Sequence, residues 1–302
     1  MRNRVRGRAV SGADQGAARS ARTPASRVLA ALLSAVAVAC ATAAAVPSAA
    51  SAAPASVRAT GADMGAGGRA PAGFVSLSDV DRTILQDIRY DTHHNFVGRP
   101  IVGYHEPLCI LTRQAAQALR RVQAAARAEG YSLKVYDCYR PQRAVDDFVR
   151  WAQRLDDQRM KTEFYPQVDK TVLFDDGYIA SRSGHSRGST MDLTLVALPA
   201  RAQRPYVPGE PLVACTEPQA RRFPDNTVDM GTGYDCFDPL AHTLDPRVTG
   251  PAMDNRLLLK RLMEEAGFAN YANEWWHYTL ANEPYSDTYF DFPVARGAVT
   301  GD

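Results

Sequence analysis

The sequence predicts an α+β fold: a single compact domain with a central, mainly antiparallel sheet and flanking helices. Segments with helical periodicity and segments with strand alternation are mixed along the chain, without the regular β-α alternation of a parallel sheet. The chain has 302 residues, of which 45% are hydrophobic, and this is enough for one good-sized core. We therefore expect one folded domain over residues 73–294 and a short tail at residues 295–302.

The first predicted elements are a helix, a strand and a second helix. Small and apolar residues recur at helical spacing over residues 112–129, and Gly130 is a natural stop. In residues 132–139, polar and apolar side chains largely alternate, as in a strand. Pro141 suits the first turn of a helix, and apolar residues follow it at helical spacing. Arg140 therefore lies at the junction between a strand and a helix.

The second half of the chain predicts a strand, a helix and a final strand. Residues 190–196 are typical of a strand. A helix is predicted from Asp254, as its capping residue, to Ala266, with Gly267 ending it. Residues 275–280 are predicted to form the last strand.

The first 52 residues have the order of an export signal. Seven arginines precede an alanine-rich apolar run at residues 28–39, and a small-x-small cleavage site ends at Ala52. A membrane anchor is the alternative, but this run is shorter than a bilayer span of roughly 20 strongly apolar residues. Lipid modification of Cys40 is a further alternative. Residues 53–72 contain few large apolar side chains and are predicted to be a flexible linker.

The charge balance gives no support for nucleic-acid binding. The formal charge of the whole chain is +2, and removing the six net positive charges of residues 1–52 leaves −4. No basic stripe with interleaved aromatic residues follows the signal. We expect no nucleic-acid partner and no stable membrane insertion once the signal is removed.

The cysteines are consistent with an oxidising compartment. Once Cys40 leaves with the signal, four remain: Cys109, Cys138, Cys215 and Cys236. An even number there suggests two disulfides. Of three possible connectivities we favour the nearer pairs, 109 with 138 and 215 with 236. The second would close a Pro-rich, charged surface insertion at about residues 198–230. Zinc ligation is the alternative, but no C-x-x-C spacing supports it.

One histidine and one aspartate are candidates for a metal site. His185 lies in a Gly- and Ser-rich loop, and Asp192 lies on the strand that follows, so that both side chains can reach one point. A catalytic zinc ion needs three protein ligands and an open position for water. His277 supplies a candidate third ligand.

Glu274 precedes His277 by three residues and is the candidate general base. In an ideal strand these two side chains face opposite sides, so we expect a bend or a strand start at Glu274. A lone histidine or aspartate is more often an ordinary polar residue, but the four together indicate a metal site. Among the other histidines, His93 and His94 are adjacent in a polar turn, and His242 is a reserve ligand.

Several separate motifs, in order over roughly residues 74–290, resemble the vancomycin-resistance D-alanyl-D-alanine dipeptidases of the VanX type. These are zinc peptidases that share a core with D-alanyl-D-alanine carboxypeptidases. The motifs are Tyr90–Tyr104, Asp137–Pro141, Ser183–Asp192, Met230–Asp235 and Glu274–His277. The resemblance implies one zinc ion with ligands His185, Asp192 and His277, and Glu274 as acid/base. It also implies Arg140 as transition-state stabiliser, and Asp235 with Ser183 near the free amino group of the substrate.

The resemblance implies zinc-dependent hydrolysis of the dipeptide D-alanyl-D-alanine. Because this chain carries an export signal, we expect it to act outside the cytoplasm, in the turnover of cell-wall peptidoglycan. The closest alternative is a D,D-carboxypeptidase or another stem-peptide hydrolase on the same scaffold. A non-catalytic, zinc-containing binding module is less consistent with Glu274, because a structural metal site needs no uncoordinated carboxylate. Two histidines and one aspartate also suit nickel, cobalt or iron.

Overall fold

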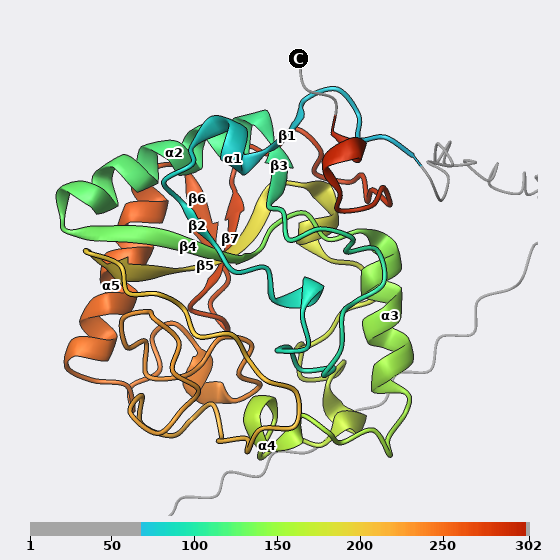
Figure 1. The fold of residues 1–302 in the computed structure, drawn as a ribbon, viewed down its shortest axis with the longest axis vertical. Helices are drawn as coiled ribbons and strands as arrows, with labels where there is room; N and C mark the ends of the chain where they lie inside the picture. The colour runs from blue at the N-terminus through green and yellow to red at the C-terminus, as the bar shows by residue number, and fades with distance from the viewer. Residues whose placement is uncertain (1–67, 300–302) are drawn as a thin grey trace, which may run out of the picture. The chain divides into compact units, whose positions relative to one another are not determined.

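The computed structural model describes residues 68–299, so the predicted signal peptide and most of the predicted linker lie outside the described residues. In this part of the chain, five strands form a sheet in the order β2-β4-β5-β7-β6 (Figure 1). The strands are β2 Leu85–Gln86, β4 Tyr131–Asp137, β5 Thr190–Ala197, β6 Phe268–Asn270 and β7 His277–Leu280. Only the β2–β4 pair is parallel among these described strands. The α+β class and the mainly antiparallel sheet are confirmed.

A smaller sheet lies at the start of the described chain. Strand β1 (Phe74–Ser76) pairs antiparallel with β3 (Ile110–Thr112). The short helix α1 (Leu77–Val80) follows β1 directly. Regular structure therefore begins at Phe74, close to the predicted start of the domain.

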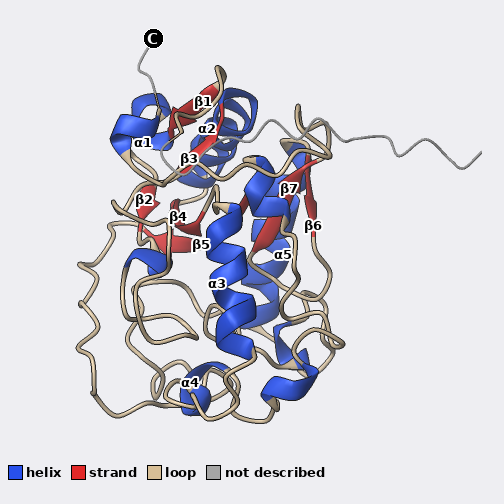
Figure 2. Cartoon of the chain, turned by 90° about the vertical axis from the view of Figure 1, so that its right-hand side faces the viewer, coloured by secondary structure: helices blue, strands red, loops and turns tan. Residues whose placement is uncertain are grey.

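Helices α2 (Arg113–Ala128) and α5 (Pro251–Glu265) cover one face of the central sheet, since α2 contacts β4, α5 contacts β6, and the two helices contact each other. The side chain of Thr112 caps α2 by accepting a hydrogen bond from the amide of Ala115 at 3.3 Å. Helix α3 (Gln142–Ala152) lies in front of α5 in Figure 2, below most of the strands. The short helix α4 (Lys161–Phe164) follows it.

Two predicted boundaries were wrong. Helix α5 begins at Pro251, after Gly250, and not at Asp254. The fixed φ of proline suits the first helical position, where no backbone donor is needed, and Asp254 lies one turn inside. The last strand begins at His277, two residues later than expected. The predicted end of α5 is confirmed, because Gly267 follows it with a φ of 93°.

Residues 198–230 contain no helix or strand, and every residue there except Cys215 and Met230 is at least partly exposed. The insertion is nevertheless attached to the sheet. Asp225 pairs with the buried Lys134 on β4. The amide of Val228 donates to a carbonyl of β5 at 3.0 Å.

Both predicted disulfides are present, Cys109–Cys138 and Cys215–Cys236. At the C-terminal end, Ala298 and Val299 are buried, and the carbonyl of Ala298 accepts a hydrogen bond from the amide of Ala70 at 2.7 Å. Packed structure thus continues into the predicted tail as far as Val299. Among the described residues, no helix combines the length and the apolar character needed to cross a membrane.

Candidate active site

A cavity of about 310 Å³ opens beside the ends of β4, β5 and β7, and all seven predicted site residues line it. They are Arg140, Ser183, His185, Asp192, Asp235, Glu274 and His277. Its volume lies at the small end of the range for ligand pockets, roughly 300–1,000 Å³. The cavity is therefore of a size for a small molecule.

The sheet register brings two of the predicted metal ligands together. Asp192 on β5 is paired directly with His277, the first residue of β7. His185 comes from a short 3₁₀ helix, Gly184–Arg187, which Gly188 and Ser189 connect to β5. Gly188 closes this helix with a φ of 82°, and a side chain there would collide with the ring of Phe74.

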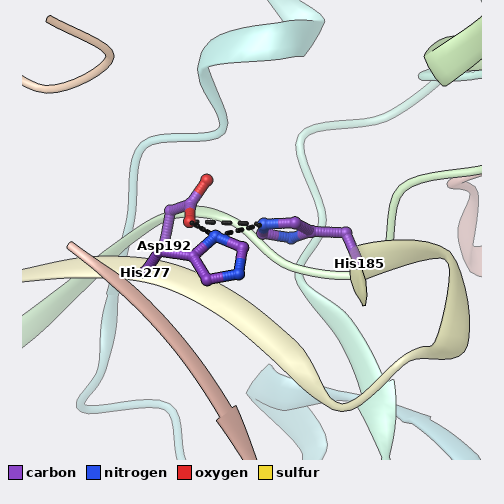
Figure 3. Close-up of side chains that lie close together, drawn as sticks. All are labelled: His185, Asp192 and His277. Carbon is purple, nitrogen blue, oxygen red and sulfur yellow. Dashed lines mark hydrogen bonds and ion pairs between the residues drawn. The ribbon is translucent and has the colours of Figure 1, made fainter. Parts of the chain in front are cut away.

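The three side chains point toward one another (Figure 3). His185 Nε2 lies 3.3 Å from Asp192 Oδ1, and His277 Nδ1 lies 3.1 Å from the same oxygen. The two ring nitrogens are 3.3 Å apart. Within residues 68–299, this is the group of potential ligands that lie close enough to share an ion.

The surroundings of these atoms fit a bound metal ion. Nδ1 of His185 lies 2.7 Å from the carbonyl oxygen of Cys138 and donates a hydrogen bond to it. Nε2 therefore carries the lone pair, and this atom faces the other two ligands. Asp192 Oδ2 accepts a hydrogen bond from Tyr234 at 2.9 Å, whereas the buried Oδ1 has no hydrogen-bond donor. A buried carboxylate oxygen without a donor is costly unless a cation neutralises it. The donor set of two imidazoles and one carboxylate is that of a catalytic zinc site.

The three candidate ligands and their surroundings shift one another's pKa values. Burial lowers the pKa of His185. Burial opposes ionisation of Asp192, but the two histidines hold the pKa of its carboxyl well below the usual range. Burial also lowers the pKa of His277, yet the negative charges of Asp192 and Glu274 raise it overall.

Glu274 lies in a turn before β7, and the amide of His277 donates to its carbonyl at 3.4 Å. The predicted bend is confirmed, because the strand starts only at His277. The carboxylate of Glu274 lies 3.4 Å from His277 Nδ1 without being part of the ligand group. Burial and the nearby Asp192 raise the pKa of Glu274 to about 7, against the effect of His277 and Arg140. This carboxyl group is poised to exchange protons near neutral pH.

Arg140 is held rigidly beside the ligands. Its Nε and Nη2 each lie 2.9 Å from Asp137 Oδ2, and Nη2 lies 3.6 Å from Asp192 Oδ2. Its guanidinium group also lies over the ring of Tyr90, 4.9 Å from the centroid. Its Nη1 donates to the hydroxyl of Ser183 at 3.5 Å. A fixed, permanently charged donor therefore faces the cavity next to the predicted metal position.

Asp235 also lines the cavity and is 5% exposed. Its Oδ2 accepts a hydrogen bond from Tyr90 at 2.7 Å, and its backbone has a φ of 55°. Burial and Asp192 raise the pKa of this carboxyl well above its usual value. A ligand cation would supply the counter-charge that this carboxylate lacks.

Comparison with known proteins decides the family. A family model described as D-ala-D-ala dipeptidase matches residues 70–200 and 222–295. The chain belongs to the D-Ala-D-Ala dipeptidase family. It is accordingly a peptidase of the dipeptidase class. The unmatched residues 201–221 fall inside the insertion, whose Cys215 therefore lies outside the family match.

Curated relatives of the D-Ala-D-Ala dipeptidase family cover most of the chain. A D-alanyl-D-alanine dipeptidase of Streptomyces coelicolor is 42% identical over 222 residues, covering 74% of this chain and 98% of that protein. One of Enterococcus faecalis is 39% identical over 223 residues, with the same coverage. One of Escherichia coli is 31% identical over 207 residues, covering 68% of this chain and 84% of that protein.

The other histidines considered from the sequence do not line this cavity. His94 is buried, with Nε2 2.7 Å from Glu163 and Nδ1 3.1 Å from Arg89. His242, the reserve ligand, does not line the cavity.

Three partners of the site residues were not identified from the sequence: Asp137, Tyr234 and Tyr90. All three lie within motifs that carry the family resemblance, and their place in these motifs is the sequence signal that could have identified them. Their hydrogen bonds join segments far apart in the sequence, except for Asp137 with Arg140.

Proposed function

We propose that this protein holds one zinc ion with His185, Asp192 and His277 and hydrolyses free D-alanyl-D-alanine outside the cytoplasm. The dipeptide would come from the turnover of cell-wall peptidoglycan. The observation that carries the proposal is the convergence of three ligand atoms beside an uncoordinated carboxylate, Glu274, in one cavity. The names of the relatives, each a D-alanyl-D-alanine dipeptidase, support the substrate.

The chemistry is divided among the residues of the cavity. A zinc ion held by His185, Asp192 and His277 would supply Lewis-acid polarisation of the scissile carbonyl and would lower the pKa of a water molecule. Glu274 accepts the proton of the attacking water and returns it to the leaving amine, a role that its pKa of about 7 suits. Arg140, fixed by Asp137, neutralises the negative charge that develops on the carbonyl oxygen.

Asp235 gives the site its preference for a free dipeptide. Its buried carboxylate pairs with the ammonium group of the substrate, while Tyr90 fixes one of its oxygens. An acylated amine carries no charge and would leave Asp235 buried without a counter-ion. A stem peptide, in which this nitrogen is acylated, is therefore a poor substrate.

Location outside the cytoplasm is supported by the signal-like residues 1–52 and by the two disulfides, which form and persist in oxidising compartments.

The test compares free D-alanyl-D-alanine with its N-acetylated form as substrates of the purified mature protein. We expect kcat/KM to be much higher for the free dipeptide. Asp235→Asn should reduce that preference, because it removes the charge that pairs with the ammonium group. A preference for the acetylated substrate would overturn the proposal in favour of a D,D-carboxypeptidase.

A further inference from the structure

One short segment, residues 232–237, reaches three different parts of the active site. The hydroxyl of Tyr234 donates to the metal-ligand candidate Asp192 at 2.9 Å. Asp235 itself lines the cavity and accepts from Tyr90. The hydroxyl of Thr232 accepts a hydrogen bond at 2.8 Å from the indole of Trp275, the residue after Glu274. The position of this segment therefore affects the metal, the substrate and the general base together.

The segment is attached to the insertion at Cys215. Cys236 is bonded covalently to Cys215, and the amide of Gly233 donates to the carbonyl of Cys215 at 2.8 Å. Cys215 is in turn anchored, since its amide donates to the carbonyl of Glu163 at 2.8 Å. The amide of Phe237 donates to the carbonyl of Phe164 at 2.7 Å. A chain of contacts thus runs from helix α4 through Cys215 to the active site.

Packing between the segment and the insertion is incomplete. A cavity of about 40 Å³ lies between them, with Cys215, Thr232, Tyr234 and Trp275 among its lining residues. The backbone of Asp235 in this segment has a positive φ of 55°, which aspartate adopts more readily than most residues. Beside this gap, the covalent bond at Cys236 ties the segment to the insertion.

We propose that the Cys215–Cys236 disulfide is a positioning element of the active site. Through segment 232–237 it sets Tyr234 against Asp192 and Asp235 against the substrate ammonium group. Cys215 lies in residues 201–221, outside the family match. The insertion therefore supplies one of the two cysteines of this disulfide. The effect on the metal rests on the proposed zinc site alone, whereas the effect on the substrate rests in addition on the proposed dipeptide substrate.

The test uses the paired variant Cys215→Ala/Cys236→Ala, with zinc affinity measured by competition against a chromogenic chelator and KM measured with free D-alanyl-D-alanine. Loss of a partner that orients a metal ligand weakens metal binding by about 10- to 100-fold. We expect a loss in that range, together with a raised KM. Tyr234→Phe should weaken zinc binding similarly, and adding it to the paired variant should cause little further loss.

A control variant separates positioning from stability. Leu119 is fully buried on α2, and no residue of that helix lines the cavity. Leu119→Ala should lower the melting temperature but leave zinc affinity and KM unchanged. A folded paired variant with the zinc affinity and KM of the wild type would overturn the proposal. If the wild type fails to cleave the dipeptide, the proposed function falls, and the zinc measurement still decides the metal part.

Discussion

Three site residues lie in one row across the sheet, because Asp137, Asp192 and His277 are register partners on β4, β5 and β7. Asp137 orients Arg140, and the other two are predicted metal ligands. Glu274 lies just outside this row, in the turn before β7. Backbone pairing therefore fixes the relative positions of two predicted ligands and of the carboxylate that orients Arg140.

Replacing Glu274 by glutamine tests the acid/base role. General acid–base catalysis contributes about 10²- to 10⁴-fold, and we expect a loss of kcat in that range. Zinc content should stay at one equivalent, because Glu274 is not in the ligand group. Steady-state kinetics and metal analysis of the same sample give both results. A variant with full activity would remove Glu274 from the mechanism.

The pH dependence of zinc binding tests the electrostatics of His277. Histidine ligates a metal only in its neutral form. Burial lowers the pKa of His277, but Asp192 and Glu274 raise it above its ordinary value of 6.5 overall. The proton therefore competes with zinc up to a higher pH than at an unperturbed histidine. Apparent zinc affinity, measured by chelator competition, should fall as the pH is lowered from about 8 to about 6. An affinity that is independent of pH over this interval would contradict the electrostatic account.

The predicted ligands could be found from the sequence because few residue types bind zinc and the chain has only six histidines. Tyr234 could not be assigned as the partner of Asp192, because that hydrogen bond spans 42 positions and depends on the path of an irregular segment. The bend at Glu274 could be inferred only from the requirement that it and His277 face the same point.

At the scale of elements, internal positions were predicted better than ends. The helical periodicity over residues 112–129 corresponds to α2, which buries Leu119 and Val122. The start of α5 was misplaced because Asp254 resembles a capping residue, whereas Gly250 and Pro251 form the actual start. Periodicity extends over many residues, but a helix end depends on one or two.

Truncating Leu119 on α2 should destabilise the fold without changing the chemistry. Removing a fully buried leucine side chain to alanine costs about 2–5 kcal/mol of unfolding free energy. Urea denaturation of Leu119→Ala should show a loss in this range. At a temperature where the variant is folded, kcat should match that of the wild type. A change below about 0.5 kcal/mol would mean that α2 is less tightly packed than the structure indicates.

For the molecule as a whole, export is the feature to test in the cell. The predicted cleavage site ends at Ala52, so the mature chain should begin at Ala53. N-terminal sequencing of the protein recovered from outside the cytoplasm checks this. Protein that stays in the cytoplasm with its first 52 residues attached would contradict the proposed location.

The most direct test of the whole account is hydrolysis of free D-alanyl-D-alanine by the purified mature protein, with a chelator and then with zinc added back. The account predicts cleavage that is lost on chelation and restored by one equivalent of zinc. It also predicts that His185→Ala and His277→Ala bind zinc weakly and stay inactive after zinc is added. Cleavage that continues at full rate in the metal-free protein would contradict the account.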